Sequence, residues 1–105
     1  MSATFDDLRP DERELVGGWT DEDSGSSPDA VDQRIFFLVT RRLEKRALVH
    51  GGWDQLFLDP RDGRLWELTF PRGSLFGGGP RRLAVIAPED ARAKYGADAV
   101  ATPSD

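Results

Sequence analysis

The sequence predicts an α+β fold: a small antiparallel sheet with a central β-hairpin packed against one long helix, plus short N- and C-terminal helices. Three observations lead to this prediction. Residues 29–47 repeat apolar side chains at spacings of three and four, as an amphipathic helix does. Residues 53–59 and 64–70 are apolar runs on either side of a turn sequence. Residues 82–87 form a third run with strand character.

The N-terminal third alternates short predicted elements with polar sequence. A helix is predicted over residues 10–14, because proline suits the first helical position and acidic residues suit the first turn. Residues 15–20 indicate a short strand, in which Gly17 and Gly18 suggest a bulge or a close backbone contact. Residues 21–29 are polar and rich in serine, so a loop is expected there.

The long helix is predicted over residues 29–47, with Ser27 as N-cap and Pro28 at its first position. Residues 35–40 would also suit a strand, but the helix-forming tail that follows them favours a helix. Phe37 lies off the main apolar face and indicates a second contact surface. The apolar face comprises Val31, Ile35, Leu38, Val39 and Leu43.

The hairpin is the strongest local signal. Its turn, residues 59–63, contains Pro60 to preset φ and Gly63 to supply a positive φ. Trp53 and Trp66 flank it and suit either core packing or an interface anchor. After a loop at 71–80, residues 82–87 predict a third strand. Residues 88–95 predict a final helix that stops at Gly96.

Length and composition favour one domain, residues 1–105, with its core at about 8–96 and flexible ends at 1–7 and 97–105. Apolar residues make up 38% of the chain, enough for one core. The absence of Cys excludes disulfides and Cys-based metal sites. No apolar run approaches the roughly 18 residues of a membrane span, and the start is acidic, unlike a secretory signal. We therefore expect a cytoplasmic protein that does not contact membranes.

Charge is distributed unevenly along the chain. Residues 1–32 contain ten acidic and two basic side chains, whereas residues 33–105 contain nine and twelve, so the net charges are −8 and +3. An acidic segment of this kind is typical of a surface that binds a basic partner, and also of a solvated surface that aids solubility. Because phosphate binding needs clustered cations, the overall charge of −5 argues against nucleic-acid binding. The basic cluster at residues 41–46 is the contrary sign.

Few residues suit catalysis or metal binding. His50 is the only histidine, and no nucleophile-elbow spacing surrounds Ser74, so a Ser-His-Asp site is not indicated. We interpret His50 as a residue at the C-terminal end of the long helix. Glu67 could pair with Asp54 or Asp59 for acid–base work, although ion pairs with arginines are the simpler interpretation.

Two loops superficially resemble ligand-binding motifs. The turn at residues 59–63 lacks the spaced acids and the distal glutamate of a calcium loop. Residues 77–80, Gly-Gly-Gly-Pro, match neither the Walker pattern nor the dinucleotide fingerprint. Both are interpreted as backbone turns, and no cofactor or metal is expected.

Several strings taken together resemble a known family. They are Leu15–Trp19, Arg34–Ile35, residues 51–71, residues 77–83 and residues 89–96. Their order resembles the Immunity protein 27 family of bacterial polymorphic toxin systems over roughly residues 8–96. The resemblance implies a small cytoplasmic protein that binds and neutralises a toxin made by the same cell. It offers no catalytic residues, so it implies a protein that is not an enzyme.

The first hypothesis is therefore an immunity protein that acts by affinity on a cognate toxin domain, and its acidic surface suits a cationic nuclease. One alternative is a regulatory or nucleic-acid-binding module that uses the basic helix face at Arg41, Arg42, Lys45 and Arg46. Another is a small hydrolase using His50 or the hairpin carboxylates. The predicted toxin contacts are five acids and one aromatic anchor: Asp21, Glu22, Asp23, Asp29, Asp32 and Phe37.

Overall fold

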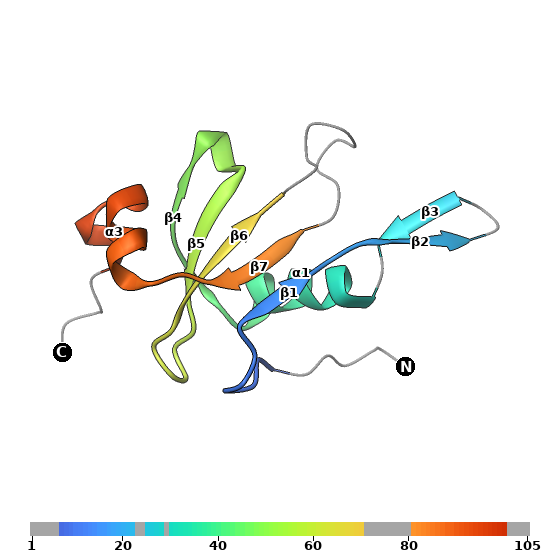
Figure 1. Cartoon of the computed structure of the whole chain (residues 1–105), viewed down its shortest axis with the longest axis horizontal. Helices are drawn as coiled ribbons and strands as arrows, with labels where there is room; N and C mark the ends of the chain where they lie inside the picture. The colour runs from blue at the N-terminus through green and yellow to red at the C-terminus, as the bar shows by residue number, and fades with distance from the viewer. Residues whose placement is uncertain (1–6, 23–24, 29, 71–80, 101–105) are drawn as a thin grey trace.

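The computed structural model describes residues 7–22, 25–28, 30–70 and 81–100, with the backbone alone for 19–22 and 25–28. It confirms the α+β fold class: an antiparallel sheet in the order β1-β7-β6-β5-β4, a separate β2–β3 pair, and helices (Figure 1). The elements are β1 (Glu14–Val16), β2 (Trp19–Glu22), β3 (Gly25–Pro28), α1 (Ala30–Arg41), β4 (Glu44–Val49), η1 (His50–Gly52), β5 (Asp54–Leu58), β6 (Leu65–Thr69), β7 (Arg82–Val85), α3 (Pro88–Tyr95) and α4 (Ala97–Val100).

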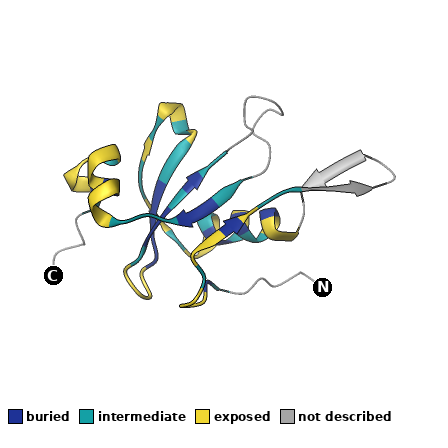
Figure 2. Ribbon diagram, viewed as in Figure 1, coloured by how far each residue is buried: buried dark blue, intermediate teal, exposed yellow. Residues whose placement is uncertain are grey.

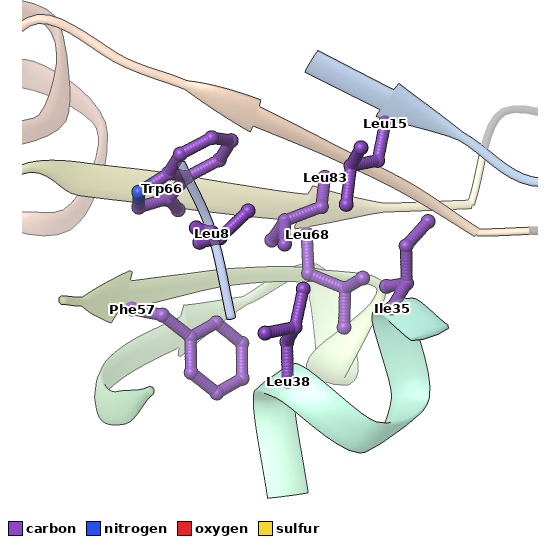
Figure 3. Packing of buried hydrophobic residues seen from close by; sticks show 8 residues of the cluster. All are labelled: Leu8, Leu15, Ile35, Leu38, Phe57, Trp66, Leu68 and Leu83. Atoms are coloured by element: carbon purple, nitrogen blue, oxygen red, sulfur yellow. The ribbon is translucent and has the colours of Figure 1, made fainter. Parts of the chain in front are cut away.

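The sheet has an apolar cluster on each face, because successive side chains of a strand point to opposite sides. Ile35 and Leu38 project from α1 toward the first face, as Figure 3 shows. The second face carries α3 and α4 at one end. Burial is concentrated in the strands (Figure 2). The first cluster is Leu8, Leu15, Ile35, Leu38, Phe57, Trp66, Leu68 and Leu83, and the second is Leu56, Leu58, Leu65, Ala91 and Ala99.

The central hairpin is confirmed. β5 and β6 pair antiparallel up to Leu58 and Leu65. The turn between them closes through the Gly63 N–H, which donates to the Asp59 carbonyl at 2.8 Å, and Gly63 has a φ of +79°. The Asp59 carboxylate accepts from the Arg61 N–H at 2.9 Å. The third strand and the final helix are confirmed as β7 and α3, and Gly96, with φ +102°, follows α3.

The predicted helix at residues 10–14 is wrong. The Glu12 N–H donates to the Arg9 carbonyl at 3.0 Å, which makes a single turn, and β1 begins two residues later. Tertiary contacts explain the difference, because Arg34 of α1 donates two hydrogen bonds of 2.8 Å to the Glu12 carboxylate. Arg64 also donates to the carbonyls of Arg9 and Glu12, which fixes the turn against the hairpin.

The long helix is shorter than predicted. α1 ends at Arg41, where the N–H groups of Arg42 and Leu43 both donate to the Leu38 carbonyl at 2.9 and 2.8 Å. The predicted tail instead forms β4, which pairs with β5 as an edge strand. Propensity for a helix is a weak term, and sheet pairing overrides it here.

The predicted loop at residues 21–29 is also wrong in part. β2 and β3 pair antiparallel from Trp19 opposite Pro28 to Glu22 opposite Gly25. Figure 1 shows this hairpin extending away from the five-stranded sheet. Polar residues without apolar alternation gave no strand signal, so the pairing was not predicted. At the other end, residues 97–100 form α4 where a flexible tail was expected, while residues 1–6 and 101–105 lie outside the described residues.

Candidate binding groove

An open groove lies between α1 and the sheet. α1 packs mainly against β1, β3 and β7, and among the described residues no other helix covers the β4–β5 side of the same face. The space left has a volume of about 240 Å³. Its lining comes from α1, β4, β5, β6 and the residues next to β6 and β7: Phe36, Val39, Thr40, Lys45, Gln55, Phe57, Leu68, Phe70 and Arg81.

Exposed apolar side chains surround this groove. Phe36 is 52% exposed on its rim. Trp53, 47% exposed, contacts Phe70 edge to face with ring centroids 5.5 Å apart and so extends the wall. Leu48, also exposed, lies directly opposite Gln55 in the β4–β5 register and therefore shares its face. Exposed apolar patches with polar rims mark interaction sites.

A buried ion pair fixes one wall of the groove. The Asp32 carboxylate accepts from the Arg81 backbone N–H at 2.8 Å and from its guanidinium at 2.7 Å. The Arg81 guanidinium lies 5.0 Å from the centre of the Phe36 ring. The Gly17 N–H donates to the Arg81 carbonyl at 2.7 Å, and a Cβ on Gly17 would lie only 2.8 Å from the Asp32 Cβ. The predicted close backbone contact is therefore confirmed at Gly17.

The charge of the groove is positive. Its lining contains Lys45 and Arg81 but no carboxylate within the part of the chain that the structure describes. Arg81 is paired with Asp32, whereas the exposed Lys45 ammonium has no ion-pair partner among the described residues. The groove thus combines an aromatic wall with one unneutralised cation.

A second polar cluster joins α3 to the sheet. Lys94 Nζ lies 3.0 Å from an Asp54 oxygen and 2.6 Å from a Glu67 oxygen. The Tyr95 hydroxyl donates to Glu67 at 2.8 Å, and His50 Nδ1 lies 2.8 Å from Asp54. The two carboxylates predicted as an acid–base pair are therefore held together by a lysine, whereas Asp59 lies in the hairpin turn.

The pKa values in this cluster follow from burial and pairing. Burial raises the pKa of Asp54, but hydrogen bonds from Lys94 and His50 outweigh it and leave that pKa below its ordinary value. Burial lowers the pKa of Lys94, and its contacts with Glu67 and Asp54 more than reverse this. Burial and Glu67 both raise the pKa of Tyr95. At neutral pH this is a compensated ion-pair network.

The predicted contact residues fall in different environments. Asp21 and Glu22 lie on β2, in the extending hairpin, while Asp23 and Asp29 lie outside the described residues. Asp32 is 2% exposed, so the prediction of an accessible acid is wrong: its carboxylate is committed to Arg81. Phe37, predicted as the aromatic anchor, is partly buried: it packs against the core, with the Arg42 guanidinium 5.0 Å from the centre of its ring.

The structure divides the predicted basic helix face. Arg41 ends α1, Arg42 follows it, and Lys45 and Arg46 lie on β4, so the four do not share one helix face. Arg42 pairs with Asp7 at 2.8 Å, and Arg46 pairs with Glu44 at 2.8 Å.

The other candidates also have defined places, where the structure describes them. Contrary to the prediction, His50 is not at the C-terminal end of the long helix: α1 ends at Arg41, and His50 begins the short 3-10 helix η1 between β4 and β5, with φ +55°. Trp66 is fully buried, so the interpretation of this residue as part of the core is confirmed, whereas Trp53 is exposed. Ser74 and residues 77–80 lie outside the described residues.

Within the described residues, no three His, Asp or Glu side chains come together as metal ligands. No helix there has the length and apolar character needed to cross a bilayer. Sequence reasoning missed Phe36, Lys45 and Arg81 as a common site. Phe36 was visible only as part of an apolar run, and its contact with Arg81 spans 45 positions, which no local pattern reports.

The fold and the groove define a small α+β protein with an exposed aromatic surface suited to binding another molecule. The sequence matches the model of one family, Immunity protein 27, over residues 21–87, and the chain therefore belongs to the Immunity protein 27 family. Every residue that lines the groove lies inside the matched segment. Comparisons with curated proteins and with solved structures found no match.

Proposed function

We propose that this chain is an immunity protein that binds a cognate toxin polypeptide in the cytoplasm and inhibits it by occupying its surface, without a chemical step. Membership of the Immunity protein 27 family is the observation that carries the proposal. The exposed aromatic groove supports it, since aromatic side chains dominate the energetics of protein interfaces. Inhibition by affinity needs a complementary surface and no reactive group.

The toxin that suits this chain is a cationic protein, such as a nuclease. Residues 1–32 have a net charge of −8, and the β2–β3 hairpin carries part of it away from the sheet. Long-range attraction of this kind accelerates association with a basic partner. We propose Asp21, Glu22, Asp23 and Asp29 as the acids that supply it, and leave out Asp32 because it is buried.

Co-expression tests the proposal directly. The probe is the C-terminal domain encoded by the gene immediately upstream, expressed from an inducible promoter with and without this chain. Growth should stop with the domain alone and recover when the chain is present. Growth arrest that persists at a matched level of folded chain would refute the proposed pairing.

The acidic hairpin has its own test. Replacing Asp21, Glu22 and Asp23 together by Ser should slow association with that domain and flatten its salt dependence, because attraction between exposed charges is screened by salt. The matched control replaces Glu89, Asp90 and Asp98 by Ser. These three acids lie on α3 and α4, at the other end of the molecule in Figure 1. Equal association rates for the two triple variants would remove the hairpin from the interface.

A further inference from the structure

We infer that the groove between α1 and the sheet receives an acidic segment of the toxin that carries a large apolar side chain. This inference rests on the proposed function and deepens it. It assigns the partner's contact to Phe36, Phe70, Trp53 and Lys45, on the β4–β5 side of the sheet. None of these four residues was among the six predicted toxin contacts, although the sequence left Trp53 open as an interface anchor.

The apolar half of the recognition follows from the walls. Phe36 from α1 and Phe70, which follows β6, both line the groove, and the buried core residues Phe57 and Leu68 also contribute to its lining. A volume of about 240 Å³ accommodates one large aliphatic or aromatic side chain together with adjoining backbone. Anchors that fill such pockets usually dominate the energy of an interface.

The acidic half follows from charge complementarity. Lys45 lies at the groove without an ion-pair partner among the described residues, and no carboxylate lines the groove there. An apolar anchor that brought a lysine or arginine beside it would place like charges together as water is excluded. A carboxylate near the anchor would instead pair with Lys45. The chemistry therefore selects an acidic segment over a basic one.

The groove is organised before binding. The Asp32–Arg81 ion pair holds the Arg81 guanidinium over the Phe36 ring. Gly17 packs so closely against Asp32 that a Cβ at this position would not fit, which leaves the Asp32 side chain little room to move. Trp53 and Phe70 hold each other edge to face. Side chains that are already ordered lose less entropy when a partner docks, so more of the contact energy appears as affinity.

The inferred contact has the opposite charge to the proposed hairpin contact. A toxin that meets both would present basic residues to the β2–β3 hairpin and an acidic segment to Lys45. Two contacts of opposite sign fix the orientation of a partner, since rotating it would bring like charges together. Net charge alone would not set this orientation.

The test compares two variants with two matched controls, using the upstream-encoded toxin domain, made catalytically inactive, as the probe. Phe36→Ser removes the aromatic wall and Lys45→Glu reverses the free charge. Val31→Ser changes another exposed apolar residue of α1, and Arg41→Glu reverses a nearby exposed cation, and neither residue lines the groove. We expect the dissociation constant to rise about 30-fold or more for Phe36→Ser and about tenfold for Lys45→Glu, and to change less than about threefold for the controls.

The outcomes separate the inference from the proposed function. If the wild-type chain binds the domain and all four variants bind equally well, the groove is not the contact and the inference fails while the function stands. If the wild-type chain does not bind, both fail. Sedimentation of the chain alone supplies a further check: a dimer that Phe36→Ser converts to a monomer would show a second copy in the groove and overturn the inference.

Urea unfolding of each variant separates binding from folding, and all four should keep the wild-type midpoint because their side chains are exposed. The charge reversal gives a rescue as well. A toxin variant with one acid changed to Lys should restore the affinity of Lys45→Glu and weaken that of the wild type. Failure of every such acid-to-Lys variant to restore binding would contradict a carboxylate partner for Lys45.

Discussion

At the residue scale, the burial of the Asp32 carboxylate is a feature that the sequence pattern did not indicate. Asp32 is the last of several acidic residues in the N-terminal part of the sequence, yet its side chain lies in the interior and pairs with Arg81, 49 positions away. Acids in the first turn of a helix are common because they suit its dipole, so the residue type does not reveal the burial. Gly17 was the better clue, since paired glycines indicated a close contact without identifying the partner.

Removing the charge of Asp32 should destabilise the fold. Asp32→Asn leaves the Arg81 guanidinium without its buried carboxylate, and we expect a loss of about 1.5–3 kcal/mol, the range for hydrogen bonds to charged groups. Urea unfolding at pH 7 measures it. Asp11→Asn is the control: its side chain is 83% exposed, so its effect should stay within about 0.5 kcal/mol. Equal effects would argue against the buried ion pair.

Glu12 should govern part of the stability at acid pH. Hydrogen bonding by Arg34 lowers the pKa of Glu12 from 4.5 to about 2. A carboxylate with a depressed folded pKa stabilises the protein above its unfolded pKa, and this stabilisation is lost as the pH falls through the folded value. Wild type should therefore be more stable than Glu12→Gln at pH 7, and the two stability curves should converge near pH 2. Parallel curves between pH 5 and pH 2 would contradict the assignment.

At the element scale, the sequence predicted best where local chemistry decides. The hairpin turn follows from Pro60 and Gly63, and α3 from Pro88 and Gly96, because the backbone preferences of these residues act within a few positions. β7 follows from its run of strand-forming residues. Prediction from the sequence failed where contacts with residues distant in the chain determine the secondary structure. β4 contains good helix formers, yet pairing with β5 makes it a strand, and arginines from α1 and the hairpin convert the expected first helix into a turn.

The contact between α3 and the sheet should depend on Lys94. Lys94→Met leaves Asp54 and Glu67 facing each other without their shared cation. We expect a loss of about 1 kcal/mol and faster amide hydrogen exchange in α3. The difference should hold up to about pH 10.5 and fade above it, because the folded pKa of Lys94 is raised. Arg92→Met, on the same helix, has no partner among the described residues and should change little.

At the scale of the whole molecule, the partial cover of the sheet by α1 creates the candidate site. One helix on one half of a face leaves apolar side chains of β5 and β6 beside a groove, and no residue-level pattern reports where a helix stops covering a sheet. The contact residues predicted from the sequence therefore include acids of the β2–β3 hairpin but none of the residues that line the groove. The segment that matches the family, residues 21–87, contains the groove and the acidic residues proposed for the hairpin contact.

Titration calorimetry with the inactive upstream-encoded toxin domain tests whether this chain acts by binding its toxin. We expect a one-to-one complex with a dissociation constant of about 10 nM or tighter, and an affinity that weakens as salt is raised. No heat of binding and no complex, with both proteins folded and concentrations of about 10 μM, would contradict it.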